Sequence, residues 1–349
     1  MLRIMTAGFA GAVSALAVSA AHADEIVIRD FFGTVELEFS GSGDIAAAKS
    51  GPGAGAVQIA SGDTVTIDGG QRIDRRRWQR QYNAARRGFR GRWGGGNSDP
   101  AFRRMLEEQP VVTISAPEGT DLRVVDSAVM LKAQGAAGAV EVEDNIHLLV
   151  TLGDIESGRL GVHGSGYLKA GDVAGTVAAS VHGSGDLVLG NAGSAELSVH
   201  GSGDLVAADV AGALTAAVHG SGDLEVGDVG GPVEASVHGS GDLDVGRAAG
   251  WVDARVRGSG DLAVAAASGD VEALVSGSGD LDIDGGRAAM LTASVTGSGE
   301  FGFDGVAERA RLRSSGSGGI RVGKVTGDVD ANGRDIRVDG RKVGDPRDD

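Results

Sequence analysis

The stretch SVHGSGDL, residues 180–187, recurs almost unchanged at residues 198–205, 217–224 and 236–243. It then changes gradually, to RVRGSGDL, LVSGSGDL and SVTGSGEF. Successive GSG units are 19, 18, 19, 19, 19, 19, 20 and 19 residues apart, counted at the second glycine: Gly166, Gly185, Gly203, Gly222, Gly241, Gly260, Gly279, Gly299 and Gly318. Nine copies at so narrow a period identify a repeat architecture, in which each copy is one structural unit.

Apolar and polar residues alternate on both sides of each GSG unit. Val233, Ala235 and Val237 precede one unit, and Leu243 and Val245 follow it. This alternation is typical of short, half-buried strands, and the abundant glycine disfavours helix. Two or three such strands form one coil, which stacks on the next in parallel at about 4.8 Å. We therefore expect an all-β fold, a single-stranded right-handed parallel β-helix (solenoid) with coils of about 19 residues.

The repeated His, Ser and Asp are the residue types of a hydrolase triad. A triad needs one buried, oriented His and one activated nucleophile, whereas alternation places these side chains outside in every coil. We interpret them as structural corner residues, with glycine allowing a positive φ or close backbone approach. The histidines should form one column and the aspartates a second, which is a weak cation candidate: His163, His182, His200, His219 and His238; Asp186, Asp204, Asp223, Asp242, Asp261 and Asp280.

Residues 1–23 have the plan of a secretory signal peptide, with Arg3, an apolar run and a small-residue cleavage site after Ala23. The chain has no cysteine, which excludes a disulfide scaffold. No later segment is long and apolar enough to span a membrane, so we expect no transmembrane span in the mature chain. The formal net charge of the 349 residues is −16. We expect an exported protein, located in the periplasm or at the cell surface or outside the cell.

An arginine-rich segment interrupts this acidic chain. Between Arg72 and Arg104 lie eleven arginines and two acids, interleaved with aromatic residues. The pattern fits a solvated loop, an arm docked on the acidic solenoid, or an amphipathic helix on anionic lipid; specific nucleic-acid binding is not expected. A short helix is possible over Ala101–Glu108. The candidate residues for an anionic surface are Arg75, Arg76, Arg77, Arg80, Arg86, Arg87, Arg90 and Arg92.

The iterated SGSGDL corners, each followed by an apolar pair, resemble the head GIN domain family of auto-transporter adhesins. The segments FFGTVELEFSGSGDI (31–45) and PVVTISAPEGTDLRVVDS (110–127) are similar to the family's opening strands and its entry into the repeats. The resemblance implies an exported bacterial β-helix and says little about activity. We divide the chain into a signal peptide (1–23), an N-terminal β segment (24–71), an arginine-rich insertion or linker (72–109) and GIN-like β-helix repeats (110–345).

No enzymatic motif stands out. The 19-residue period does not match calcium-binding nonapeptide repeats, and a straight histidine column converges poorly for zinc. We therefore predict no catalytic residue, no cofactor and no dedicated metal site. The favoured function is that of an adhesin-like or cell-envelope interaction module, with a polysaccharide, lipopolysaccharide or protein partner and possible peripheral membrane contact. The alternatives are a carbohydrate-active β-helix enzyme and a periplasmic structural protein tethered by its arginine-rich arm.

Overall fold

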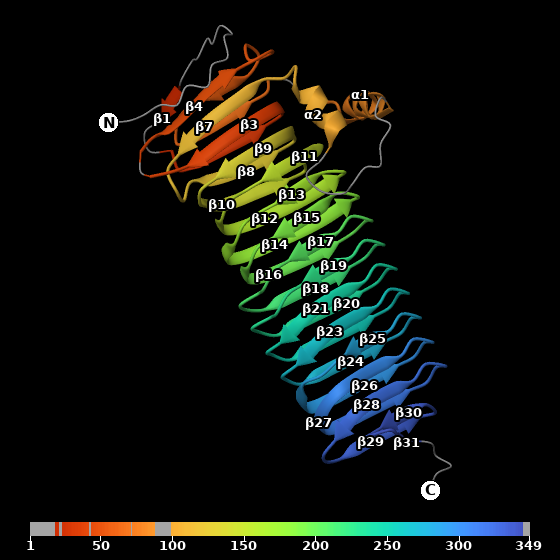
Figure 1. Ribbon diagram of the computed structural model, residues 1–349. Coiled ribbons are helices and arrows are strands. Elements are labelled where there is room, and N and C mark those ends of the chain that lie inside the picture. The colour runs from red at the N-terminus through yellow and green to blue at the C-terminus, as the bar shows by residue number, and fades with distance from the viewer. Residues whose placement is uncertain (1–17, 21–22, 42, 71, 88–98, 345–349) are drawn as a thin grey trace.

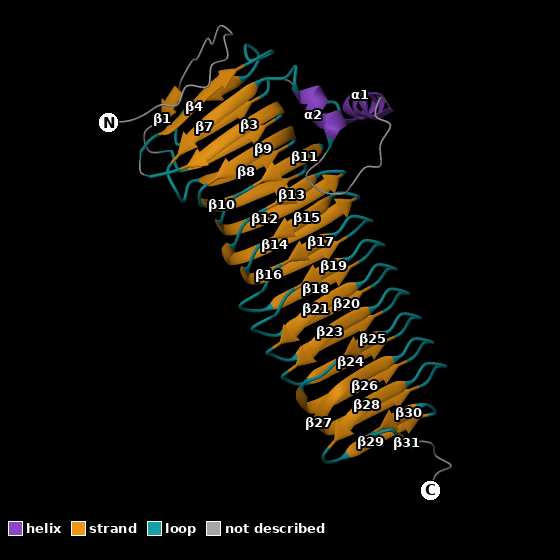
Figure 2. Ribbon diagram, in the orientation of Figure 1, coloured by secondary structure: helices purple, strands orange, loops and turns teal. Residues whose placement is uncertain are grey.

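The chain forms one long parallel β-helix of about 11 turns, with coils of about 19 residues (Figure 1). The computed structural model describes residues 18–20, 23–41, 43–70, 72–87 and 99–344. Strands make up 57% of the structure, and its two short helices lie together beside the N-terminal coils (Figure 2). The predicted all-β parallel solenoid is confirmed.

The strands fall into an N-terminal group, a central group and a C-terminal group. The N-terminal group is β1 (Val18–Ala20), β2 (Glu25–Arg29), β3 (Phe32–Phe39), β4 (Ile45–Ser50), β5 (Gln58–Ala60), β6 (Thr64–Asp68) and β7 (Val111–Ala116). The central group is β8 (Asp121–Val125), β9 (Ala128–Gln134), β10 (Ala137–Glu143), β11 (His147–Thr151), β12 (Ile155–Gly164), β13 (Tyr167–Lys169), β14 (Val173–Gly183), β15 (Asp186–Leu189), β16 (Ala192–Val199), β17 (Leu205–Ala207), β18 (Leu214–Val218) and β19 (Leu224–Val226). The C-terminal group is β20 (Val233–Val237), β21 (Leu243–Ala248), β22 (Val252–Val256), β23 (Leu262–Ala267), β24 (Val271–Val275), β25 (Leu281–Ile283), β26 (Arg287–Val295), β27 (Phe301–Ser314), β28 (Ile320–Val325), β29 (Val329–Gly333), β30 (Ile336–Val338) and β31 (Arg341–Val343).

These strands stack into two parallel runs that face each other across the core. Sheet 1 contains β6, β2, β8, β10, β12 and then the even-numbered strands to β26. Sheet 2 contains β7, β3, β9, β11, β13 and then the odd-numbered strands to β25. The long strand β27 contributes to both runs. Each coil therefore passes from sheet 1 through the GSG corner to sheet 2.

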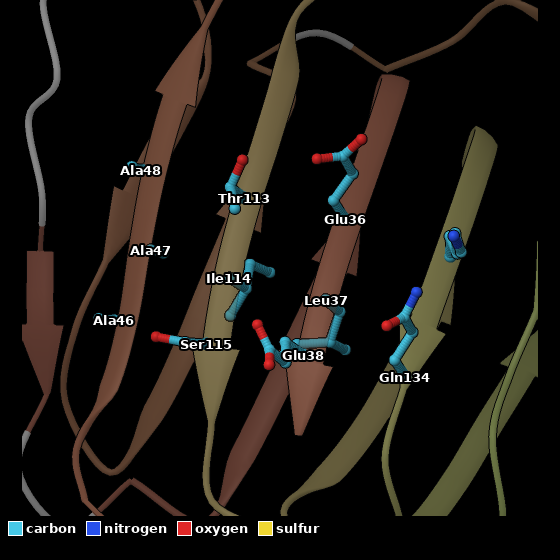
Figure 3. Close-up of a pocket in the computed structure, with 11 residues that line it drawn as sticks. Glu36, Leu37, Glu38, Ala46, Ala47, Ala48, Thr113, Ile114, Ser115 and Gln134 are labelled. Carbon is cyan, nitrogen blue, oxygen red and sulfur yellow. The ribbon is translucent and has the colours of Figure 1, made fainter. Parts of the chain in front are cut away.

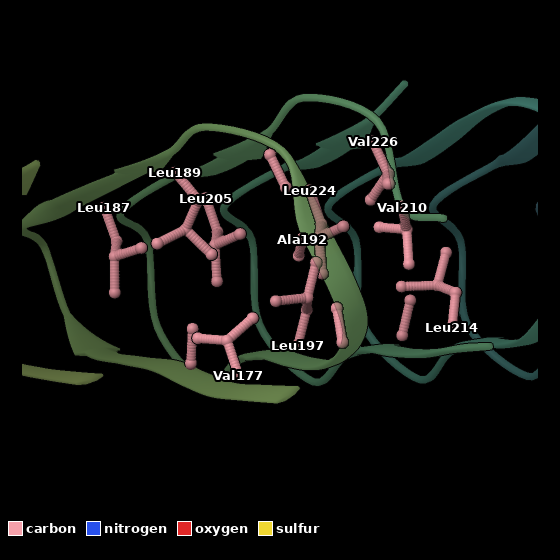
Figure 4. Packing of buried hydrophobic residues seen from close by; sticks show 14 of the residues in the cluster. Val177, Leu187, Leu189, Ala192, Leu197, Leu205, Val210, Leu214, Leu224 and Val226 are labelled. Carbon is pink, nitrogen blue, oxygen red and sulfur yellow. The ribbon is translucent and has the colours of Figure 1, made fainter. Parts of the chain in front are cut away.

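Identical apolar positions stand above one another inside this tube (Figure 4). Leu205, Leu224 and Leu243 pair in register along sheet 2, and each is at most 1% exposed. Full burial of a leucine side chain stabilises the fold by about 1.5–3 kcal/mol. Since every coil repeats the same inward positions, the core is a continuous apolar column along the stack.

The GSG glycines are required by close backbone approach. A Cβ atom on Gly241 would lie 2.0 Å from the carbonyl oxygen of Gly222 in the preceding coil. Gly222 stands in the same relation to Gly203, also at 2.0 Å. Neither Gly241 nor Gly222 has a positive φ, so contact between coils is the reason for glycine at these two positions. In the earlier corners the first glycine also has a positive φ, 93° at Gly164 and 158° at Gly183.

The N-terminal coils are not stacked in chain order. The coil β2–β3 pairs with β6–β7 on one side and with β8–β9 on the other. The chain therefore forms β2 and β3, continues outward to the end of the stack, and returns past them to begin the repeats at β8. Antiparallel strands β4 and β5 finish this end of the stack.

Strand β1 lies within the segment that the sequence predicts to be a signal peptide. It pairs with β4 in antiparallel register, and Ala23 is buried. The rest of the predicted peptide, residues 1–17 and 21–22, lies outside the described residues. The cleavage after Ala23 stays a prediction.

The arginine-rich insertion replaces the corner between β6 and β7. Its described part forms α1 (Arg75–Arg87) and α2 (Pro100–Leu106), which pack against each other (Figure 2). The sequence left open a loop, a docked arm or an amphipathic helix between Arg72 and Arg104, and the structure shows that Arg75–Arg87 is a helix docked on the solenoid. The expected second helix begins one residue earlier and ends two residues earlier than Ala101–Glu108.

Candidate functional site

Helix α1 has a buried aromatic face and an outward arginine face. Trp78 and Tyr82, four residues apart, are 3% and 4% exposed. Arg76 and Arg80 lie on the opposite side of the helical turn and are exposed. Neither has an ion-pair partner among the described residues. The helix therefore presents cationic side chains to solvent from a fixed position.

An aromatic cluster holds the two helices on the solenoid. Trp78 and Tyr82 of α1 and Phe102 of α2 pack together over Ala128 and Leu149 on strands β9 and β11. The Trp78 and Tyr82 rings are stacked with centroids 5.0 Å apart, and Trp78 meets Phe102 edge-on at 6.3 Å. Aromatic pairs of this kind add about 0.5–1.5 kcal/mol to the effect of burial. The insertion is thus part of the packed structure.

A buried polar network lies inside this cluster. Asp99 is the N-cap of α2, where its Oδ1 accepts a hydrogen bond from the Phe102 N–H at 2.9 Å. Its Oδ2 accepts one from the Tyr82 hydroxyl at 2.5 Å and lies 3.0 Å from His147 Nε2. His147 is 1% exposed, with the Phe102 and Tyr82 ring centroids 4.4 and 4.9 Å from its own. One carboxylate therefore connects α1, α2 and β11.

The network also determines the charge of its members. Burial alone would raise the pKa of Asp99, but the adjacent His147 ring and hydrogen bonds from the Tyr82 hydroxyl and the Phe102 N–H outweigh it and hold that pKa below its usual range. Burial, together with the bond to Asp99, raises the pKa of Tyr82 well above its usual value. Asp99 is therefore ionised at neutral pH and Tyr82 is a hydrogen-bond donor.

The sequence did not single out Asp99 or His147 as site residues. Asp99 lies within the glycine-rich stretch GGGNSDP (94–100), and His147 begins an apolar strand. The available signal was Asp99 directly before Pro100, since an aspartate followed by proline is a helix-start pattern. That signal predicts the cap but not its partners on other elements.

The eight predicted arginines do not form one cluster. The Arg75 guanidinium donates to the Asp144 carbonyl oxygen at 2.7 Å and lies 4.0 Å from Asp126, so it ties the helix to two neighbouring corners. Arg76, Arg77, Arg80 and Arg86 are exposed. The backbone of Arg87 ends α1, and nothing is described of its side chain. Arg90 and Arg92 lie outside the described residues.

The predicted aspartate column exists, and its carboxylates bond the next coil. The backbone N–H of Asp242 donates to Asp223 Oδ1 at 2.9 Å, and that of Asp261 donates to Asp242 Oδ1 at 2.8 Å. The same bond links Asp204 to Asp223, Asp261 to Asp280 and Asp280 to Glu300. We call this row of carboxylates the aspartate ladder. Its capping role agrees with the structural interpretation of the motif.

A second column of this kind was missed in the sequence. At the opposite corner, the backbone N–H of Asp209 donates to Asn191 Oδ1 at 3.3 Å, and that of Asp228 donates to Asp209 Oδ1 at 2.9 Å. The signal was present, because each of these residues precedes the corner's inward Ala or Val at the period of the repeat.

The outer face of sheet 2 beside the aspartate ladder is acidic. Partial burial and then its neighbours Asp242, Glu225 and Asp223 raise the pKa of Asp244. The described residues contain no group of three or more His, Cys, Asp or Glu side chains that could hold a metal ion. Weak calcium binding at the ladder, of millimolar affinity, stays a prediction.

The predicted histidine column is also present. We call His163, His182, His200, His219 and His238 the histidine ladder; adjacent ring centroids are 4.7–4.9 Å apart. The histidine ladder runs along the edge of the solenoid that the GSG corners form. Helix α1 lies at the N-terminal end of this same edge, because Arg75 contacts the corner residues Asp126 and Asp144. Arginine face, histidine ladder and aspartate ladder thus line one edge of the solenoid.

The N-terminal coils also carry a shallow depression of about 450 Å³ on the outer face of β4, β7, β3 and β9 (Figure 3). Glu36 and Glu38 of β3 lie beside Thr113 and Ser115 of β7. The polar side chains that line this depression stand in separate rows along the strands and do not converge on one point.

Neither helix in the described part of the chain is long and apolar enough to cross a membrane.

A family model described as "Putative auto-transporter adhesin, head GIN domain" matches residues 149–249 and 233–335. Together these matches span residues 149–335, which is more than half of the 349 residues. The chain belongs to this family. The predicted GIN-domain resemblance is therefore confirmed, and the matched residues are the regular repeats that carry both ladders.

Two solved structures are similar to this GIN-domain chain. One is described as a "putative adhesin" from Bacteroides fragilis; it is 18% identical, with a TM-score of 0.33, and 92% of this chain and 98% of that chain are covered. The other, a "putative adhesin" from Parabacteroides distasonis, is 15% identical, with a TM-score of 0.24, and the covered shares are 92% and 97%. A comparison with curated proteins finds no match.

Proposed function

We propose that the protein is an exported, non-enzymatic, adhesin-like module that binds anionic groups of the cell envelope through the arginine face of α1. The observation that carries this proposal is that Arg76 and Arg80 project outward from a helix whose opposite face is fixed by the buried Trp78, Tyr82 and Asp99. Phosphate and carboxylate groups of lipopolysaccharide or acidic polysaccharide are the ligands that such a face attracts.

Two further features support binding at this end of the molecule. The chain as a whole carries 48 acidic and 32 basic residues, so the arginine face is an exception on an acidic surface. An acidic shaft is repelled by an anionic envelope, and this repulsion favours contact through the helix end. The adhesin description of the family is consistent with such a role.

The test measures binding of the full chain to vesicles that contain lipopolysaccharide, at low and at physiological salt. The variant Arg76→Glu/Arg80→Glu reverses the arginine face. The matched control Arg287→Glu/Arg334→Glu makes the same change of net charge at exposed positions far along the repeats. We expect the first variant to lose most of the salt-sensitive binding and the control to keep it.

Equal loss in both variants would show that net charge alone governs binding, and would contradict the proposal. Turnover of an acidic polysaccharide without a retained complex would favour the carbohydrate-active enzyme. Fractionation of cells that produce the chain tests its export, and a chain that stays in the cytoplasm would contradict an envelope role.

A further inference from the structure

The histidine ladder forms a stack of parallel imidazole rings. Adjacent ring planes differ by only 2–6° over five consecutive coils. The register of the strands causes this, since His163 pairs with His182 and the valines that precede the later histidines also pair. His182, His200, His219 and His238 are exposed, whereas His163 is half-buried. One edge of the solenoid therefore carries a line of solvent-facing ring edges.

These rings offer nitrogen lone pairs at neutral pH. An imidazole has an ordinary pKa of about 6.5, so at pH 7 most histidine side chains are neutral and one ring nitrogen carries a lone pair. Arg257 takes the next position of the column, with its guanidinium nitrogen 3.2 Å from His238 Nε2. Because a guanidinium only donates hydrogen bonds, this His238 nitrogen is an acceptor. A neutral imidazole nitrogen is the commonest metal ligand in proteins.

We propose that adjacent histidines of the ladder chelate a divalent transition-metal ion such as Zn²⁺, with two imidazoles to each ion and water completing the shell. A Zn–N bond is about 2.0–2.1 Å long and zinc is tetrahedral in proteins, so two ligating nitrogens lie roughly 3.3–3.4 Å apart. The ring centroids are 4.7–4.9 Å apart, so the two nitrogens must approach each other by roughly 1.4 Å. Rotation of the exposed histidine side chains about χ1 and χ2 tilts the parallel rings toward a shared ion and brings the nitrogens together.

The aspartate ladder is the competing cation site, and the two differ in chemistry. Its carboxylates already accept backbone N–H bonds, and oxygen ligands favour Ca²⁺ over Zn²⁺. The proposed site therefore depends on the adjacency of two imidazoles. Five histidines in a row form at most two adjacent pairs that share no histidine, so the ladder can bind two ions.

Two variants that each remove two histidines test adjacency directly. His182→Ala/His219→Ala leaves three histidines with no adjacent pair, whereas His163→Ala/His238→Ala leaves three adjacent ones. Zn²⁺ is titrated into the full chain by calorimetry, with histidine NMR signals recorded in parallel. We expect two ions for the wild type, one ion for His163→Ala/His238→Ala, and loss of chelation for His182→Ala/His219→Ala.

Ca²⁺ titrations should be the same in all three proteins. Melting curves and circular dichroism verify the fold, and glutamine replaces alanine at any position where alanine unfolds the chain. Wild-type Zn²⁺ stoichiometry in His182→Ala/His219→Ala, or equal losses in the two variants, would overturn the proposal. So would an absence of Zn²⁺-induced changes in the histidine signals of the wild type.

Discussion

Gly241 carries only a hydrogen atom where other residues carry a Cβ, and this allows the coils to stack closely. At this position the backbone of one coil lies against the backbone of the preceding coil, with no room for a methyl group. The same contact recurs at Gly222 and Gly260, each with its own preceding glycine. Glycine at these corner positions is therefore a packing requirement of the stack.

Gly241→Ala should destabilise the fold. The added Cβ would meet the Gly222 carbonyl oxygen at 2.0 Å, and overpacking of this kind costs about 1–3 kcal/mol. Thermal or denaturant unfolding measures the loss. Gly62→Ala is the control, because nothing lies within 4 Å of a Cβ at that exposed position. Equal stability of the two variants would show that the coils can separate at the corner without cost.

The histidine ladder should lower the stability of the fold when the pH becomes mildly acidic. The pKa values of His182, His200 and His238 lie below 6.5 in the folded chain, first because of partial burial and then because of neighbouring positive charge. Between the pKa of a histidine in the folded chain and its pKa in the unfolded chain, the unfolded chain binds more protons than the folded chain. The free energy of unfolding therefore falls as the pH falls through about 6.5.

Below the folded pKa values both states are protonated, and this contribution stops changing. Melting temperatures measured between pH 7.5 and 5 should decrease, and less so when all five ladder histidines are glutamine. Histidine NMR titrations should be broad and coupled. Five independent steps at an unperturbed pKa would contradict this prediction.

Among the elements, α1 and α2 depend on one carboxylate for their attachment. Asp99 begins α2, accepts from Tyr82 of α1 and lies against His147 of β11. Loss of the Asp99 carboxylate leaves the buried Tyr82 hydroxyl without its acceptor, which costs about 1–3 kcal/mol. The other contacts that fix the two helices are the aromatic cluster and the bond of Arg75 to Asp144, so loss of Asp99 should weaken the docking of the helices before it weakens the repeats.

Asp99→Ala should release the helices without unfolding the repeats. Trypsin cleaves at arginine only when the backbone is accessible, so cleavage within residues 75–87 should become much faster. Far-UV circular dichroism should keep its β-sheet signal. The control Asp74→Ala removes the cap of α1, which accepts from the Arg77 N–H at 2.7 Å, and leaves the buried network in place. Unchanged cleavage in Asp99→Ala would show that the aromatic cluster alone holds the helices.

The repeats could be predicted from sequence because their information is local and periodic. Val181 and Leu187 alternate with polar neighbours, and the register follows from the 19-residue spacing. The docking of α1 could not be predicted in this way. Asp99 meets His147 across 48 positions of the chain, and no period connects them. The outward arginines were identified as residues, but their fixed orientation depends on those distant contacts.

For the whole molecule, stability should be close to a sum over coils and their interfaces. Deleting residues 222–240 removes one 19-residue period and joins Ser221 to Gly241, so the GSG corner is restored. This variant should still fold, but it should unfold at a lower denaturant concentration than the wild type. Solution scattering should show a molecule shorter than the wild type by about 4.8 Å.

Deleting only residues 222–231 should prevent folding of the C-terminal coils, because it shifts the inward positions out of register. Circular dichroism and unfolding curves distinguish the two variants. Equal damage by both deletions would contradict a modular stack.

The order of the N-terminal coils has a mechanical consequence. The coil β2–β3 lies between β6–β7 and β8–β9, so tension applied near residue 24 pulls on a layer held from both sides. Backbone bonds on both flanks of this layer must then break before it is released. At the other end, β31 pairs with β30 alone among the described strands, and tension there opens its few bonds one after another. A molecule loaded along its length should therefore yield from its C-terminal end, while the end that carries the arginine face stays intact.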